Sequence, residues 1–406
     1  MNLRTAPALQ AIAGLALSLS LAACTGGTED TESTSDTSDT SDSTGADTDG
    51  PDASCEGLQL PMLDESSCAP LGTDYTPRDM MSANDGWDAC VSDDAAYHLV
   101  ETTPSSIARA EAYEDIADLL WRNGTPSKED FTAARDIYAI AEGLGSRLER
   151  REDLHYPEIP MSDWDPVVDP DKQCTVGENT TKYPDRCAGP AKLTPIVTDA
   201  FAAGQSGEGD PDIHAARIDA AFLWFYYIST YKEANTCATV VAKDCDSSWG
   251  YYTGGNGIDG GIALAGLIRA ASVESHNRIW DGLLAVRCWR DLTQDMGTYP
   301  LLDELPAADQ ELFAQGWEQL DQALHRGYAR MLRARMAKMT EDKCSGAGSA
   351  THWAFLQIAG PVLDREASER GAPEAPSLKA LWEMDSPTAQ DIADGMAALD
   401  AIFPCG

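Results

Sequence analysis

One stretch, residues 237–292, concentrates the aromatic, glycine, histidine and charged residues that small-molecule sites use. Apolar walls with a few polar points are the usual make-up of such a pocket. The glycine-rich run 253–261 would let a ligand approach the backbone closely. We therefore predict a ligand-binding site built from Trp249, Tyr251, Tyr252, His276, Asp281 and Arg287. The alternative is that the aromatic residues of this stretch pack in the core.

Sequence context excludes two kinds of nucleotide site here. Gly255, Gly257 and Gly260 have the spacing of a dinucleotide-binding fingerprint, but no strand precedes them and no strand–helix alternation surrounds them. No Gly-Lys-Ser or Gly-Lys-Thr follows, which excludes a phosphate-binding loop. The run is therefore expected to be a loop flanked by disulfides.

The six histidines lie apart in the sequence. No two share a predicted helix at metal-ligand spacing, and neither His-Glu-x-x-His nor Cys-x-x-Cys occurs. We predict no metal site and no cofactor. If the protein is an enzyme, His276 is the residue expected to act, so the alternative function is an exported hydrolase that uses His276 and nearby carboxylates, with or without a metal.

The elements that must position these residues are predicted to be helices. The longest runs from Pro306 to Met339, about 50 Å at 1.5 Å per residue, and its apolar residues recur at three- and four-residue steps. The apolar helix predicted at 211–233 is its expected partner. Further helices are predicted at 104–122, 126–142, 195–203, 262–271, 274–292, 351–370 and 387–402. The predicted fold class is all-α, a disulfide-stapled multi-helix bundle with long irregular loops.

A capping or turn residue followed by proline begins several of these helices. Proline at the first helical position wastes no hydrogen bond, and the preceding side chain can cap free amides. The pairs are Thr103-Pro104, Thr125-Pro126, Thr194-Pro195, Asp210-Pro211 and Ser386-Pro387.

The folded domain is expected to span 55–406. Its first part, 55–100, is rich in Pro, Asp, Gly and Ser and contains three cysteines, which indicates a loop-rich cap. Between 151 and 192 the helical pattern breaks into an excursion, and such excursions are either functional or pinned by covalent links. We place a soft internal boundary there.

The N-terminus is typical of an exported protein. Residues 1–23 contain one basic residue and a short apolar run, the pattern of a signal peptide. The segment ends in Leu21-Ala22-Ala23-Cys24, which resembles the lipobox of bacterial lipoproteins. That resemblance implies lipid attachment at Cys24, a lipid bilayer as partner, and a place in the bacterial cell envelope, at the outer membrane or cell surface rather than the inner membrane.

Residues 24–54 are predicted to be a disordered acidic tether of Ser, Thr and Asp. The whole chain of 406 residues has 67 acidic residues against 29 Lys and Arg, a formal net charge of −38. Such a charge would repel nucleic acid, so we predict no nucleic-acid partner.

The cysteines indicate a disulfide framework. Apart from Cys24, the other ten of the 11 cysteines form an even set, as expected for bridges in an exported protein. Close spacing predicts Cys174 with Cys187 and Cys237 with Cys245. The sequence leaves open the pairing of Cys55, Cys68, Cys90, Cys288, Cys344 and Cys405.

The helical body resembles the imelysin-like families, two-bundle helical proteins of the bacterial periplasm and surface. The resemblance rests on Ser248-Trp249-Gly250-Tyr251 and on Thr351-His352-Trp353-Ala354-Phe355, each near the start of a helical segment. It implies a helical fold over residues 100–402. The family's Gly-x-His-x-x-Glu motif is not matched. The most similar segment is Asp212-Ile213-His214-Ala215-Ala216-Arg217, which has Asp in place of Gly and Arg in place of Glu. With no catalytic motif present, the leading hypothesis is a membrane-anchored helical module that binds a ligand.

Overall fold

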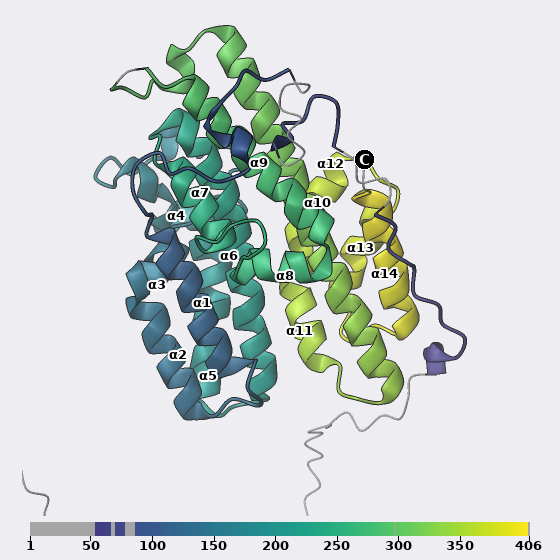
Figure 1. Ribbon diagram of the computed structural model, residues 1–406. Helices are drawn as coiled ribbons and strands as arrows, with labels where there is room; N and C mark the ends of the chain where they lie inside the picture. Colours follow the sequence, from purple (N-terminus) through teal and green to yellow (C-terminus); the bar gives the residue numbers. More distant parts are fainter. Residues whose placement is uncertain (1–52, 66–69, 78–85, 296, 405–406) are drawn as a thin grey trace, which may run out of the picture. The chain divides into compact units, whose positions relative to one another are not determined.

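The computed structural model describes residues 53–65, 70–77, 86–295 and 297–404, all within one compact unit (Figure 1). The described residues form helices and no β-strand, which confirms the all-α prediction. In chain order the α-helices are α1 (Ser106–Leu120), α2 (Lys128–Ile140), α3 (Leu144–Glu149), α4 (Gly177–Lys182), α5 (Thr194–Ser206), α6 (Pro211–Thr239), α7 (Asp244–Thr253), α8 (Ala263–Ala271), α9 (Val273–Leu292), α10 (Ala307–Ser345), α11 (Ala350–Ala359), α12 (Asp364–Glu369), α13 (Ala375–Trp382) and α14 (Ala389–Ile402).

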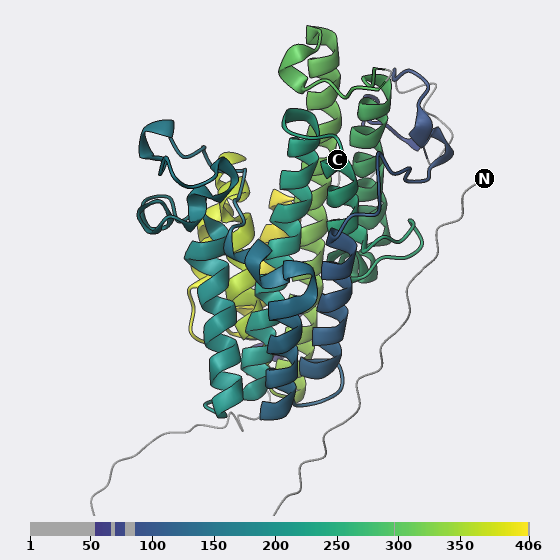
Figure 2. The ribbon, with the colours of Figure 1, turned by 90° about the vertical axis from the view of Figure 1, so that its left-hand side faces the viewer.

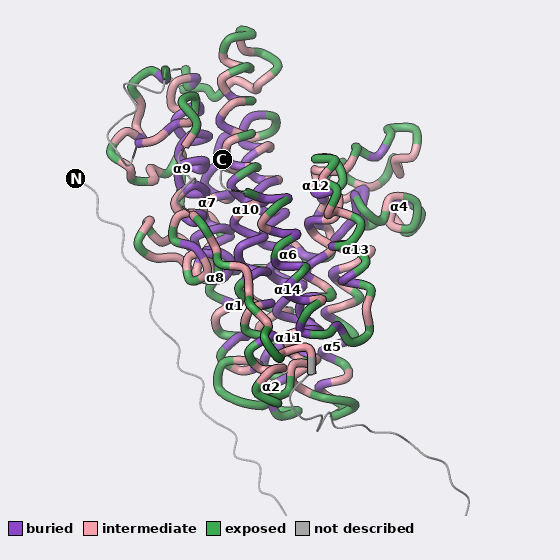
Figure 3. The backbone as a smooth tube through the Cα atoms, turned by 90° about the vertical axis from the view of Figure 1, so that its right-hand side faces the viewer, coloured by how far each residue is buried: buried purple, intermediate pink, exposed green. Residues whose placement is uncertain are grey.

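Two groups of helices meet along α6. In the first, α1, α5 and α7 pack against α6, and α2 packs against α1 and α5; in the second, α9, α11 and α14 pack around α10. Helix α11 joins the groups because it packs against both α6 and α10. Every residue from 222 to 228 of α6 is buried, as its apolar sequence predicts, and Figure 3 shows this helix buried along most of its length.

Helix α10 is 39 residues long, and its principal partner differs from our expectation. It contacts α6, but it packs most extensively along α9. The reason is Gly282 of α9, which lets the backbones approach closely: a Cβ added there would lie 2.6 Å from the Cα of Leu320. The sequence shows this glycine but not which helix it faces.

Four disulfides join the described parts of the chain. Cys174–Cys187 and Cys237–Cys245 confirm the two pairings predicted from spacing. Cys55–Cys344 ties the start of the 55–100 cap to the end of α10, and Cys90–Cys288 ties the cap to α9. The cap is therefore stapled to the body. Cys24, Cys68 and Cys405 lie outside the described residues.

The predicted pairs of a capping or turn residue followed by proline lie within a few residues of observed helix starts. Asp210 caps α6 as predicted, since its carboxylate accepts a hydrogen bond from the backbone N–H of Asp212 at 2.9 Å. At α2 and α14 the capping residue instead follows the proline: Ser127 and Thr388 each form a capping box with the aspartate three residues later.

The arginines near the end of α10 have structural roles. Arg330 and Arg333 both form ion pairs with Asp400 of α14, at 2.6 and 2.9 Å. The Nε of Arg326 donates to the backbone oxygen of Pro404 at 2.9 Å. These charges therefore fix α14 against α10, as expected for a basic stripe in an acidic protein.

The excursion between 151 and 192 lies inside the same compact unit as the helices on either side of it. It contains short helical turns and α4, and it carries its own small apolar cluster of Ile159 and the Cys174–Cys187 bridge, with Trp164 and Tyr183 packed against it.

Among the residues described, no helix has the length and hydropathy required to cross a bilayer.

Candidate metal centre

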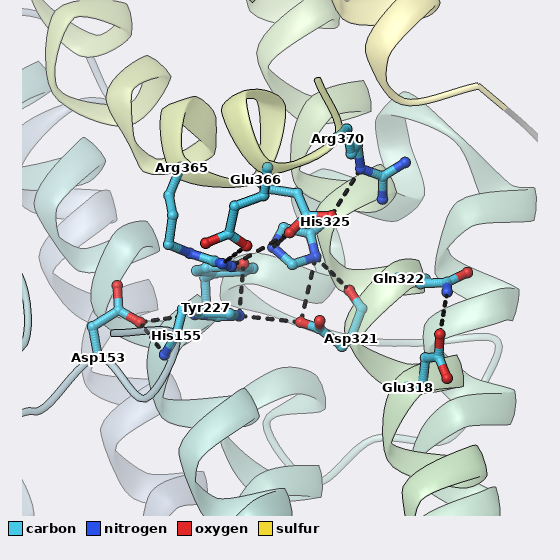
Figure 4. Close-up of polar contacts among 11 residues, drawn as sticks. Asp153, His155, Tyr227, Glu318, Asp321, Gln322, His325, Arg365, Glu366 and Arg370 are labelled. Atoms are coloured by element: carbon cyan, nitrogen blue, oxygen red, sulfur yellow. Dashed lines mark hydrogen bonds and ion pairs between the residues drawn. The ribbon is translucent and has the colours of Figure 1, made fainter. Parts of the chain in front are cut away.

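Two histidines and an aspartate meet where the excursion, α6, α10 and α12 come together (Figure 4). Asp321 and His325 lie one turn apart on α10, so both side chains leave the same face of that helix. His155 comes from the irregular segment after α3. One potential ligand atom from each residue lies within 4.8 Å of the other two.

The separations match those of ligands that share one metal ion. The Nε2 of His155 lies 3.1 Å from Oδ1 of Asp321, and the Nδ1 of His325 lies 3.3 Å from the same oxygen. Two ligands bound at about 2.1 Å to one ion, at tetrahedral or octahedral angles, are about 3.0–3.4 Å apart.

A second carboxylate faces the outer nitrogen of each histidine. The Nδ1 of His155 lies 2.8 Å from Oδ1 of Asp153, and the Nε2 of His325 lies 3.7 Å from Oε2 of Glu366. Carboxylates placed in this way orient metal-binding imidazoles and make them more basic. Glu366 is itself held by Arg370, whose Nε donates to it at 2.8 Å.

Aromatic rings enclose the centre. Tyr231 of α6 stacks on the His155 ring with 3.8 Å between the centroids, and the hydroxyl of Tyr227 lies 3.4 Å from its Nε2. The side chains of His155 and His325 are 4 % and 2 % exposed, whereas that of Asp321 is 25 % exposed. Solvent therefore reaches the group through the aspartate.

The electrostatics of the group favour a cation. Burial opposes a charge on His155, but hydrogen bonds to Asp153 and Asp321 outweigh it and raise the pKa of this imidazole to about 9. Burial would raise the pKa of Asp321, yet the bond with His155 and the nearby charges lower it overall. Burial lowers the pKa of His325. At neutral pH the imidazolium of His155 and the nearby guanidinium of Arg365 are therefore the positive charges beside Asp321, and a metal bound at Nε2 of His155 would displace the proton of that nitrogen.

The donor set is two imidazole nitrogens and a carboxylate oxygen. Zn²⁺, Fe²⁺ and Mn²⁺ accept such ligands, whereas Ca²⁺ and Mg²⁺ prefer oxygen alone. The Nδ1–H of His325 donates to the backbone oxygen of Asp321 at 2.9 Å, so a metal bound at this nitrogen would replace that proton.

The six residues predicted to bind a ligand lie elsewhere, and the structure does not bring them to one cavity. Trp249 lines a cavity of about 560 Å³ beside residues 256–260 of the glycine-rich run, together with Trp280. Tyr251 lies beneath a different cavity, where its hydroxyl accepts hydrogen bonds from Arg109 and Arg151 at 3.0 and 3.2 Å.

The other four are buried in contacts with protein groups. His276 has its Nδ1 3.0 Å from the Tyr252 hydroxyl and its Nε2 2.8 Å from the backbone oxygen of Ile258, so both ring nitrogens are occupied. Asp281 lies 3.5 Å from the guanidinium of Arg278, and the guanidinium of Arg287 is 2.5 Å from the backbone oxygen of His98. These contacts favour core packing for this part of the predicted set.

Sequence reasoning missed the histidine–aspartate group. Its one local signal is the four-residue spacing of Asp321 and His325 on a strongly periodic helix, which places them on one face. His155 is 166 residues from Asp321 in the chain, and only tertiary packing brings it there.

The chain matches no protein-family model, no curated protein and no solved structure.

Proposed function

We propose that the protein is an exported, lipid-anchored helical module that binds a divalent transition-metal ion at His155, Asp321 and His325. The observation that carries the proposal is the pair of nitrogen–oxygen separations, 3.1 and 3.3 Å, to one carboxylate oxygen. Lipid attachment at Cys24 and the acidic tether would hold this module at the cell envelope.

Binding is favoured over turnover because the ligands are enclosed. The two imidazoles are almost fully buried and are packed against tyrosine rings, which leaves little space for a substrate beside the ion. A catalytic metal site needs an open coordination position facing a cavity, whereas a closed site retains its ion. His276, the residue expected to act in a hydrolase, has both ring nitrogens bound to protein atoms.

Metal titration tests the proposal. After dialysis against EDTA, the wild-type domain is expected to bind one Zn²⁺ or Co²⁺ per chain, measured by calorimetry and by the visible absorption of Co²⁺. His155→Ala and His325→Ala should each weaken binding at least 100-fold, because each removes a ligand.

His98→Ala is the matched control, since His98 is a surface histidine whose side chain is 40 % exposed and faces Asp94. It should bind as tightly as the wild type. Equal affinity in the His155→Ala and wild-type proteins, or no stoichiometric binding of either ion, would overturn the proposal.

A further inference from the structure

Leu154, the residue that precedes His155, lines a cavity that does not include the metal ligands. The excursion, drawn at the upper left of Figure 2, covers this cavity of about 420 Å³ next to α3 and α6. A volume of this size is typical of sites for small organic ligands. The excursion is largely irregular, and it supplies a wall of the cavity that α3 and α6 alone would not form.

Part of the cavity lining is apolar. Its apolar residues are Leu154, Ile159, Trp164, Pro170 and Val240. The indole N–H of Trp164 donates to the backbone oxygen of Ile159 at 3.0 Å, so this ring presents its faces and not its polar atom. The Cys174–Cys187 bridge packs behind Ile159 and holds the wall in place.

The lining also contains four arginines, and most of their charges are paired. Arg186 pairs with Glu152 and Arg151 pairs with Glu233, both at 2.8 Å. Arg150 has a looser contact with Asp171 at 3.8 Å. In the described structure Arg147 makes no hydrogen bond or ion pair with any residue, although the chain carries an excess of 38 acidic charges.

Positive charge is crowded around Arg147. Burial lowers the pKa of its guanidinium; Tyr251 opposes this shift, and the charges of Arg150, Arg109 and Arg151 add to it. Arg147 also lines an adjoining cavity of about 220 Å³, together with Arg109 and Lys243 and with the acids Glu233 and Asp244. A carboxylate that pairs with Arg147 would offset its repulsion with the neighbouring arginines.

Among the described residues, the acids on the cavity wall form no ion pair with Arg147. Glu152 is paired with Arg186, Asp171 contacts Arg150, and Glu158 is exposed. Burial, followed by the charge of Glu233, raises the pKa of Asp244 to about 6, so this carboxyl is still mostly ionised at neutral pH.

We propose that this cavity binds a small organic carboxylate whose apolar body lies on Trp164 and Ile159 and whose carboxylate pairs with Arg147. A guanidinium presents two parallel N–H donors that match a carboxylate, and this geometry selects it over a neutral group of the same shape. The site is separate from the metal centre and does not need an ion there.

The probe is 4-iodobenzoate, a carboxylate on an apolar ring with a heavy atom. With EDTA-dialysed protein, calorimetry should show one molecule bound per chain, and anomalous diffraction should place the iodine among Ile159, Trp164 and Pro170. The neutral isostere 4-iodobenzamide should bind at least 10-fold more weakly. Arg147→Met keeps the apolar stem and should also weaken 4-iodobenzoate at least 10-fold.

Arg135→Met, an exposed arginine of α2, is the matched control and should bind like the wild type. Because Arg147 forms no hydrogen bond or ion pair within the described part of the chain, Arg147→Met should keep or raise the melting temperature, whereas loss of a paired arginine would lower it. Equal binding by the Arg147→Met and wild-type proteins, an iodine outside the cavity, or no binding of 4-iodobenzoate would overturn the proposal. Inorganic phosphate binding at Arg147 without 4-iodobenzoate binding would also overturn it.

Discussion

At the scale of single residues, the metal centre depends on carboxylates that do not touch the ion. Asp153 fixes His155 from two directions, because its Oδ1 accepts from the backbone N–H at 3.1 Å and from the ring at 2.8 Å. The ring is thereby turned so that Nε2 faces Asp321. Outer groups of this kind contribute to affinity through orientation and ligand basicity.

The variant Asp153→Asn is therefore expected to weaken Zn²⁺ binding by about 10–100-fold without abolishing it. The amide keeps the size of the side chain but loses the charge that makes the imidazole a strong ligand. Competitive titration against a chromogenic chelator measures the change. Asp136→Asn, an exposed position of α2, should leave the affinity unchanged. An unaltered affinity in Asp153→Asn would show that His155 needs no orienting partner.

Asp244 should make stability depend on pH. Burial and then the charge of Glu233 raise the pKa of this carboxyl from 3.8 to about 6 in the folded state. The folded protein therefore holds the proton more tightly than the unfolded chain. The stability gained from that proton is complete below about pH 4 and is lost as the pH rises through 6.

We expect Asp244→Asn, which stays neutral, to melt at the same temperature as the wild type near pH 4 and at a higher temperature above pH 7. Thermal denaturation across this range gives the difference directly. Asp199→Asn, on the exposed side of α5, supplies the baseline. A difference that shrinks as the pH rises would contradict the assigned shift.

At the scale of elements, the close crossing of α9 and α10 positions the metal ligands. Leu320, which faces Gly282, immediately precedes Asp321. An added Cβ would meet backbone atoms of α10, which cannot turn away as a side chain can. The helices must then separate, and overpacking of this kind costs about 1–3 kcal/mol.

Gly282→Ala should thus lower the free energy of unfolding by about 1–3 kcal/mol in chemical denaturation, despite the better helix propensity of alanine. Gly177→Ala is the matched control, because no atom lies within 4 Å of its added Cβ. It should be neutral or slightly stabilising. A stabilised Gly282→Ala protein would mean that the two helices are not in close contact at this point.

The sequence predicts elements better than it predicts their partners. The apolar period located the long helices, and α10 extends from Ala307 to Ser345 against a predicted 306–339. The predicted helix at 351–370 is instead α11, a 3-10 turn and α12. Helix α7, residues 244–253, was not predicted, because its acidic and aromatic residues have no clear period.

The same limit explains the site. Trp249, Tyr251 and His276 are close in sequence, and that proximity suggested a common pocket, yet packing directs them to different surroundings. His155 gains its role from a distant helix. Local patterns record what a residue can do, whereas the choice of neighbours depends on contacts across the whole chain.

At the scale of the whole molecule, the disulfides account for eight of the 11 cysteines. If Cys24 carries lipid, Cys68 and Cys405 remain, and an exported protein is expected to pair them. Thiol titration of the denatured, unreduced domain lacking Cys24 should therefore find essentially no free thiol. Two free thiols per chain would show that Cys68 and Cys405 are not bridged.

Lipid attachment would decide where all of these sites operate. The tetrapeptide Leu21-Ala22-Ala23-Cys24 follows a short apolar run, and the acidic composition of the segment after it predicts a disordered tether. If this prediction holds, a coil of about 30 residues would have an r.m.s. span of about 30 Å, enough to keep an acidic domain clear of an anionic bilayer surface.

Cys24→Ala removes the proposed acceptor sulfur while leaving the signal peptide and the domain intact. Without the lipid, the variant should either appear in the soluble fraction or remain as the longer, unprocessed chain, because no other described segment can span a bilayer. Membrane fractionation and intact-mass measurement distinguish these results. Ser54→Ala, at the far end of the tether, should stay in the membrane fraction with its lipid mass. Cys24→Ala could instead fractionate with membranes and have the mass of the wild type apart from the substituted atoms. In that case the lipid is not attached at Cys24, and another contact holds the metal centre and the carboxylate cavity at the membrane.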